Sequence, residues 1–170
     1  MIDAGLKPAS IQLQYSLLDR RPATDMTELC IKHGIGILCY GTVAGGFFSE
    51  KYLGKSEPGE AETRSNVKYR LIIEEFGGWS LFQQLLKVLA SIAKNHNADI
   101  GTIASAWTLR QPAVKAVIVG ARNLSHQKSN LQIPEINFSE SDVRAIDEVL
   151  AHAKGPSGPV DRKSTRLNSS

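Results

Sequence analysis

An apolar run that ends in an aromatic residue and a glycine-rich loop carries the clearest chemical signal in this sequence. The run at residues 35–40 ends in Tyr40, and a loop with three glycines follows at residues 41–46. A short apolar run bounded by glycines is typical of a buried strand in a parallel sheet. The Tyr40 ring offers a flat face at the strand end, and the backbone N–H groups of the loop suit an anion. The pattern favours a ligand with a flat ring joined to phosphates.

Two glutamines precede this loop on a strand expected at residues 11–15. The side-chain amide of Gln12 has a donor and an acceptor, which can pair with a ligand carboxamide in the reciprocal arrangement. A polar residue that is hydrogen-bonded inside the fold is the alternative interpretation. Gln14 competes for either role, because it lies two residues further on and on the same face of the strand.

A third candidate lies where residues 117–131 pass from an expected strand into an expected helix. Gly120, Ala121 and Arg122 form the turn, and the N-terminus of a helix favours an anion. The Arg122 guanidinium can bind a phosphate through two hydrogen bonds or cover an aromatic base. These properties suit the phosphate-bearing end of a nucleotide.

In chain order, the three segments resemble the C-terminal half of the aldo/keto reductases, NADP(H)-dependent oxidoreductases built on a (β/α)8 TIM barrel. The resemblance covers residues 3–153 and implies an α/β fold, an incomplete barrel of about strands 6–8 with their helices. It implies that Tyr40 stacks on the nicotinamide ring, that Gln12 binds its carboxamide, and that Lys51 adds charge at the phosphates. The alternatives are a core tyrosine whose hydroxyl reaches a backbone group and a solvated surface lysine. Arg122 would meet the 2′-phosphate that distinguishes NADPH from NADH. The cofactor-binding residues implied are Gln12, Tyr40, Gly41, Thr42, Val43, Ala44, Gly45, Lys51, Gly120, Ala121, Arg122, His126 and Asn130.

The sequence departs from the family pattern at both ends of this expected site. The family often has Ser-Pro-Leu at positions 41–43, so a hydroxyl contact is either lost or moved to Thr42. In the family a basic or amide side chain, an acid and an asparagine bind the adenosine end of the cofactor. His126, Ser129 and Asn130 occupy these positions here. Asn130 matches, His126 substitutes for the first group, and Ser129 lacks the carboxylate that would bind the adenine amine.

Carbonyl reduction also needs a proton donor near the carbonyl oxygen. In the aldo/keto reductases a tyrosine serves, assisted by a lysine, an aspartate and a histidine from the first half of the barrel. None of those motifs occurs in this sequence, so we assign no catalytic residue. Cys30 and Cys39 lack the spacing of a metal site or a disulfide framework, and we expect them to be small packing residues.

The length also bounds the fold. A chain of 170 residues can bury a core but falls short of the roughly 250 residues of a complete (β/α)8 barrel. We expect residues 1–153 to be the C-terminal part of such a barrel, a fragment that is poorly stable alone because its sheet edges are unpaired. We expect residues 154–170, which are basic and rich in Gly, Pro and Ser, to be disordered or artefactual.

The formal net charge of +3 does not indicate an acidic partner. The last nine residues hold three basic groups and no acidic one, and without them the chain has 17 basic and 17 acidic residues. The remainder has no basic stripe for nucleic acid or a membrane surface. The sequence shows no N-terminal signal and no long apolar span, which favours a cytoplasmic or organellar-soluble protein.

Strands and helices alternate along the chain, and they must position the candidate cofactor-binding residues. Strand, helix and strand within residues 11–40 predict a βαβ unit with parallel strands. Residues 41–68 form a long connection without sustained periodicity, as functional lids and binding loops do. The expected strands are 11–15, 35–40 and 116–119. The expected helices are one from Thr24 or Asp25 to His33, then 80–95, 102–110 and 124–131, and a last one that Ser139 and Asp142 open and that ends near Ala153.

Together these patterns predict the cofactor-binding part of an NADP(H)-dependent aldo/keto reductase. In its full-length form such an enzyme transfers hydride between NADPH and a small aldehyde or ketone, or oxidises sugar-type alcohols in the reverse direction. Two alternatives stay open: a nucleotide-sensing subunit similar to the potassium-channel β subunits of this family, and a truncated product that is inactive on its own. The sequence names no particular substrate, because specificity in barrels comes from the βα loops.

Overall fold

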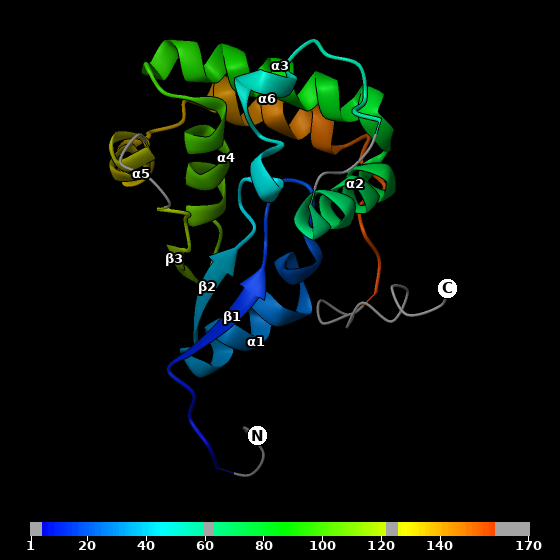
Figure 1. Ribbon diagram of the computed structural model, residues 1–170. Helices are drawn as coiled ribbons and strands as arrows, with labels where there is room; N and C mark the ends of the chain where they lie inside the picture. Colours follow the sequence, from blue (N-terminus) through cyan, green and yellow to red (C-terminus); the bar gives the residue numbers. More distant parts are fainter. Residues whose placement is uncertain (1–4, 60–62, 122–125, 159–170) are drawn as a thin grey trace.

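A computed structural model describes residues 5–59, 63–121 and 126–158 of the chain (Figure 1). Within these ranges, three strands form one parallel sheet in the order β1-β2-β3, so that β2 lies in the centre. The strands are β1 (Ser10–Gln14), β2 (Gly36–Tyr40) and β3 (Val114–Val117). The predicted α/β class and the three parallel strands are confirmed.

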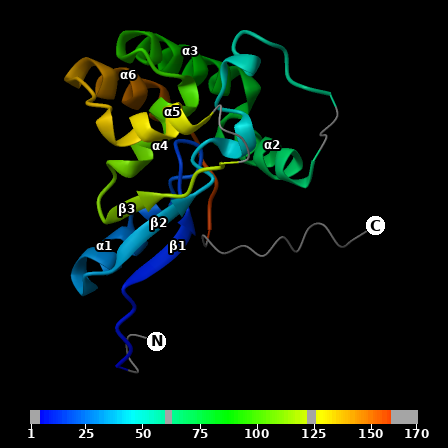
Figure 2. The same ribbon diagram turned by 60° about the vertical axis from the view of Figure 1, so that its left-hand side comes forward.

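Helices connect the strands and cover the sheet. In the described part of the chain they are α1 (Asp25–His33), α2 (Arg64–Phe76), α3 (Gly78–His96), α4 (Ile100–Leu109), α5 (Gln127–Gln132) and α6 (Glu140–Leu150). Helix α1 links β1 to β2, whereas α2, α3 and α4 all lie between β2 and β3. Figure 2 shows α3, α5 and α6 grouped on the side toward which β1 and β2 point. None of the described helices combines the length and the apolarity needed to cross a bilayer.

The unit β1-α1-β2 follows directly from its sequence. The two strands pair in parallel along their whole length. Helix α1 ends where Gly34 adopts a φ of 67°, which allows the Gly34 N–H to donate to the carbonyl oxygens of Cys30 and Ile31. Cys30 and Cys39 are buried and free, as expected for small packing residues.

Two faces of the sheet differ, because alternate side chains of a strand point to opposite sides. On one face Leu13, Ile37 and Cys39 are buried in a cluster that includes residues of α1 and α4. On the other face Gln12 is exposed and Tyr40 is half-buried. This second face therefore presents polar and aromatic side chains at the ends of the strands.

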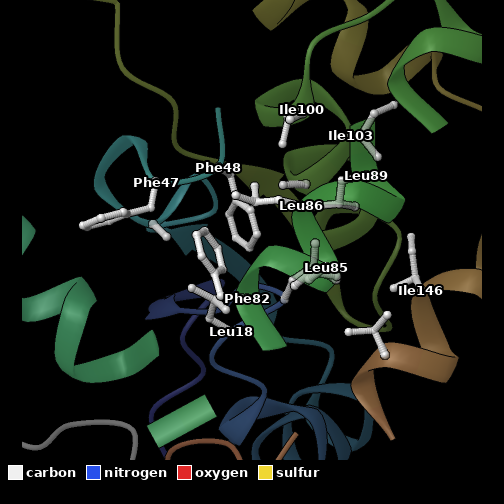
Figure 3. Packing of buried hydrophobic residues seen from close by; sticks show 14 of the residues in the cluster. Leu18, Phe47, Phe48, Phe82, Leu85, Leu86, Leu89, Ile100, Ile103 and Ile146 are labelled. Atoms are coloured by element: carbon white, nitrogen blue, oxygen red, sulfur yellow. The ribbon is translucent and has the colours of Figure 1, made fainter. Parts of the chain in front are cut away.

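The larger core surrounds α3. In Figure 3, side chains of α3 lie among those of the segments after β1 and after β2, of α4 and of α6. The labelled residues are Leu18, Phe47, Phe48, Phe82, Leu85, Leu86, Leu89, Ile100, Ile103 and Ile146. Phe82, Leu85 and Leu89 are fully buried. Burying one such side chain contributes about 1.5–3 kcal/mol. The core thus holds the loop after β2 against two helices.

Helix α2 is not among the helices expected from the sequence. It begins at Arg64, inside the stretch 41–68 that we expected to be irregular. Thr63 caps it, because the Thr63 side chain accepts a hydrogen bond from the Asn66 N–H (3.1 Å). The polar first turn of this helix hides its start, since the apolar periodicity appears only further on.

Other elements lie close to their expected positions. Helix α6 has the predicted capping box, in which Ser139 Oγ accepts from the Asp142 N–H (3.1 Å) and Asp142 Oδ2 accepts from the Ser139 N–H (2.9 Å). Strand β3 lies slightly earlier than residues 116–119, and its register against β2 shifts between Ile37 and Leu38. The expected start of α5 at Leu124 lies outside the described residues.

Candidate functional site

The loop after β2 turns at glycines that the fold requires. Gly41 and Gly45 have φ values of 77° and 63°, a region that other residues rarely adopt. Both also pack against Tyr69 of α2: a Cβ on Gly41 would overlap the Tyr69 hydroxyl, and a Cβ on Gly45 would lie 2.6 Å from Tyr69 Cδ2. Gly46, with a φ of 95°, faces open space. Positions 41 and 45 therefore need glycine for two reasons, backbone conformation and close approach.

Some backbone N–H groups of the loop donate hydrogen bonds within the loop, whereas others have no backbone acceptor in the part of the chain that the structure describes. The Ala44 N–H donates to Gly41 O (3.0 Å), and the Gly46 N–H donates to Val43 O (2.9 Å). Within the described residues, the N–H groups of Val43 and Gly45 have no backbone acceptor. The loop therefore keeps a fixed shape and retains donors for an anionic ligand.

The second half of the loop is fixed to α3. The rings of Phe47 and Trp79 pack edge to face with centroids 6.2 Å apart. The Trp79 indole N–H donates to Lys55 O (2.8 Å), and Gln83 Nε2 donates to Tyr52 O (2.8 Å). These contacts make this part of the long connection a packed wall and not an open lid.

A cavity of about 290 Å³ lies between this loop, the first turns of α4 and the turn after β3. Its lining consists of Val43, Gly46, Phe48, Ser49, Glu50, Asp99, Gly101, Thr102, Ser105, Val119, Gly120, His126, Ser129, Asn130 and Ile133. Three segments that are far apart in the sequence thus meet at one place. In the part of the chain that the structure describes, no group of three or more His, Cys, Asp or Glu side chains is arranged to hold a metal ion.

An acidic residue at the start of α4 faces this cavity. Asp99 Oδ1 accepts a hydrogen bond from the Thr102 N–H (2.6 Å) and so caps the helix. Burial by itself would raise the pKa of Asp99, but hydrogen bonds from Ser129 and Thr102 and the nearby His126 hold that pKa below its usual value. The cavity therefore contains a carboxylate at neutral pH.

Direct contacts join α4 to the loop. A Cβ on Gly101 would lie 3.3 Å from Phe48 O, so glycine permits the close approach of the helix. Glu50 Oε1 accepts a hydrogen bond from the Ile100 N–H (2.8 Å), which satisfies a donor in the first turn of α4. The loop after β2 and the first turn of α4, which form two walls of the cavity, therefore fix each other's position.

The turn after β3 forms the third wall. Asn130 Nδ2 donates to Gly120 O (3.2 Å), which ties the first turns of α5 back to the end of the strand segment. Thr102 Oγ1 donates to Ser129 O (3.3 Å), which ties α5 to α4. His126 is exposed at the edge of the cavity. Arg122 lies outside the described residues.

The structure brings together four of the residues expected from the sequence, namely Val43, Gly120, His126 and Asn130. Gly41, Ala44, Gly45 and Ala121 are not in the lining of the cavity. Thr42 is buried and its hydroxyl lies 2.9 Å from the Ser105 hydroxyl, so it ties the loop to α4. Lys51 is exposed and its Nζ lies 5.2 Å from the centroid of the Tyr52 ring.

Sequence reasoning missed the contribution of α4. Asp99, Gly101 and Thr102 all line the cavity. The available signal was Asp99, a residue that favours the N-cap position, directly before an apolar run. That signal predicts where a helix begins, but it does not predict which cavity the helix faces.

Tyr40 lies apart from the cavity, at the end of β2. Its ring is half-buried, and Lys68 Nζ of α2 lies 5.3 Å from the ring centroid. The same Nζ lies 5.2 Å from the centroid of the Tyr69 ring. The two tyrosines and the ammonium group form a cation–π cluster at the mouth of the sheet.

Of the two glutamines of β1, Gln14 enters a buried polar network near Tyr40. Gln14 Nε2 donates to Asp19 Oδ2 (2.8 Å), and Arg21 Nε donates to Asp19 Oδ1 (2.8 Å). Gln12 is exposed on the same strand. Gln12 thus has a side-chain amide open to a ligand, whereas the amide of Gln14 is engaged within the fold.

This arrangement of loop, helix and turn agrees with a family match. A model of the aldo/keto reductase family matches residues 1–151. The chain belongs to the aldo/keto reductase family. A thermostable aldo-keto reductase crystallised with the inhibitor epalrestat is 27% identical, with a TM-score of 0.55 over 82% of this chain and 39% of that chain. A glycerol dehydrogenase from Gluconobacter oxydans has the same fold, with a TM-score of 0.72 at 20% identity over 92% and 47% of the two chains.

Curated relatives are similar over most of this chain. The protein tas of Escherichia coli (strain K12) is 27% identical over 84% of this chain and 41% of its own length. Probable aldo-keto reductase 1 of Glycine max is 24% identical over 83% of this chain and 39% of its own length. Flagellar radial spoke protein 5 of Chlamydomonas reinhardtii is 34% identical over 64% of this chain and 21% of its own length. The chain therefore spans less than half the length of these relatives.

Proposed function

We propose that this chain is the cofactor-binding part of an NADP(H)-dependent aldo/keto reductase that acts on a small carbonyl compound or sugar. In this proposal β1, β2 and β3 are about the sixth to eighth strands of a barrel. The single observation that supports it is the cavity where the glycine loop, the start of α4 and the turn after β3 converge. The adenosine end of a nucleotide suits this cavity, because apolar walls meet there with hydrogen-bonding side chains such as those of Asp99 and Asn130.

The order of the elements fits an extended dinucleotide. Tyr40 is followed at once by the loop with the unused N–H groups of Val43 and Gly45. The loop leads in turn to the cavity with His126 and Asn130. A ligand could therefore place its nicotinamide ring at Tyr40, its phosphates on the loop and its adenosine end in the cavity. The open space at Gly46 leaves room for the phosphates.

The residues of this chain would bind and orient the cofactor. When bound, NADPH supplies the hydride that adds to the carbonyl carbon. Tyr40 would fix which face of the nicotinamide ring points to the substrate, and the exposed Gln12 amide would bind the carboxamide. We assign the proton donor to another part of the barrel, since this sequence lacks the family motifs that carry it.

Titration of the chain with NADPH, followed through tryptophan fluorescence, tests the proposal. Trp79 packs on the binding loop and should report the ligand. We expect saturable binding, tighter for NADPH than for NADH. Asn130→Ala should weaken it by about three- to tenfold, because it removes a hydrogen bond that shapes the turn.

Asn95→Ala, on the exposed surface of α3, is the matched control and should bind like the unchanged chain. The proposal fails if the chain melts cooperatively by circular dichroism and yet binds neither nucleotide. It also fails if Asn130→Ala and Asn95→Ala have equal affinities.

A further inference from the structure

Lys68 brings a positive charge close to the aromatic ring on which the cofactor would stack. Its Nζ lies 5.3 Å from the centroid of the Tyr40 ring and 5.2 Å from that of Tyr69. Lys68 belongs to α2, which lies beside the end of β1 in Figure 1. The position of the charge is therefore set by a helix and by two rings and does not depend on a flexible loop.

The surroundings compensate this charge only in part. Asp19, whose charge acts on Lys68, is fully buried and already forms an ion pair with Arg21. Lys68 itself forms no ion pair among the described residues. Burial raises the pKa of Tyr69 to about 12, so that its phenol stays neutral. Desolvation lowers the pKa of Lys68 and Arg21 adds to this effect, while Asp19 opposes it.

We propose that Lys68 makes this site distinguish the two redox states of the cofactor and favour the reduced one. This inference rests on the proposed function, in which Tyr40 holds the nicotinamide ring. The oxidised nicotinamide ring carries a positive charge, whereas the reduced ring is neutral. An ammonium group beside the stacking surface repels the first ring and leaves the second almost unaffected. The preference of this site for NADPH over NADP⁺ would therefore be stronger than that of the same site without Lys68.

Coulomb's law gives the order of magnitude of the effect. For two unit charges roughly 10 Å apart at an effective dielectric constant of about 30, the affinity changes about six- to sevenfold. The same repulsion would speed the release of NADP⁺ after carbonyl reduction. At equal concentrations of the two cofactor forms, the site would thus hold a larger share of NADPH than a site without Lys68.

The dissociation constants of NADPH and NADP⁺ should be measured for the unchanged chain and for three variants. Lys68→Met removes the charge and keeps most of the side-chain volume, whereas Lys68→Arg keeps the charge. Lys87→Met is the matched control on the exposed face of α3. We expect Lys68→Met to shift the ratio of the two constants about six- to sevenfold toward NADP⁺. Lys68→Arg and Lys87→Met should leave the ratio unchanged.

Each outcome of this experiment decides the question. If both cofactor forms bind and Lys68→Met leaves their ratio unchanged, the inference is wrong and the proposed function stands. If neither form binds to the folded chain, the proposed function fails and the inference fails with it. Lys68→Gln serves as a second neutral variant should Lys68→Met not melt cooperatively. Higher salt should reduce the difference between charged and neutral variants, because ions screen the repulsion.

Discussion

Gly41 combines two constraints at one residue. Its positive φ excludes most side chains, and the Tyr69 hydroxyl fills the space that a Cβ would need. We predict that Gly41→Ala lowers the free energy of unfolding by about 3 kcal/mol, as the sum of backbone strain and overpacking. Gly46→Ala, with a positive φ but open space, should cost about 1–2 kcal/mol. Urea denaturation of both variants measures the difference, and equal losses would contradict the packing argument.

Asp142 is the residue whose charge should affect stability in acid. Burial alone would raise its pKa, but hydrogen bonds from Ser139 and His96 and the charge of His96 hold that pKa below its ordinary value. A depressed folded-state pKa gives stability that is present above the unfolded-state pKa of about 4 and is lost as pH falls through the folded-state pKa.

We therefore predict that Asp142→Asn weakens the chain near neutral pH and flattens the loss of stability below about pH 4. Asp147→Asn, at an exposed position of the same helix, is the control and should leave that loss unchanged. Denaturation curves measured from neutral pH down to roughly pH 2 would show how the free energy of unfolding of each variant depends on pH. A slope in acid that is the same for both variants would exclude the proposed role of Asp142.

Among the elements, α3 contributes most to the core that supports the binding loop. Leu85 is fully buried in it, whereas Leu71 of α2 is 53% exposed. Leu85→Ala should lower the free energy of unfolding by about 2–5 kcal/mol, because the surrounding side chains cannot fill the space that the shortened side chain leaves. Leu71→Ala should change it by less than about 0.5 kcal/mol. Thermal melts of the two variants check this prediction, which similar losses would refute.

Elements with strong local signals could be predicted from the sequence. Gly34 predicts the end of α1, and Ser139 with Asp142 predicts the start of α6, since caps depend on neighbouring residues alone. The start of α2 could not be predicted, because Thr63 caps a first turn with no apolar periodicity. The end of the connection after β2 was therefore placed too late.

The candidate site also has parts that could be predicted from the sequence and parts that could not. The glycine loop and the turn at Gly120 could be found, because each is a local pattern of strand, glycine and helix. The wall supplied by α4 could not, since Asp99 and Thr102 reach the cavity only through long-range packing. The engagement of Gln14 with Asp19 also depends on a backbone turn that no spacing rule predicts.

At the scale of the whole molecule, the sheet has two edges within the described residues. Strands β1 and β3 each pair on one side only, and Ile118 after β3 is 45% exposed. Unpaired edges favour association with other chains. We predict that the chain self-associates with rising concentration and that Ile118→Lys reduces this, whereas Val143→Lys on α6 does not. Sedimentation velocity measures it, and equal association of both variants would contradict an edge contact.

The central position of β2 also sets an order of assembly. Ile37 lies opposite Ile11 of β1 and opposite Val114 of β3. The second partner is roughly three times as far along the chain, and closing that longer loop costs about 1 kcal/mol more in chain entropy. We expect β1, α1 and β2 to form the folding nucleus and β3 to join last. The nucleotide cavity, whose third wall follows β3, would then be complete only at the final step of folding.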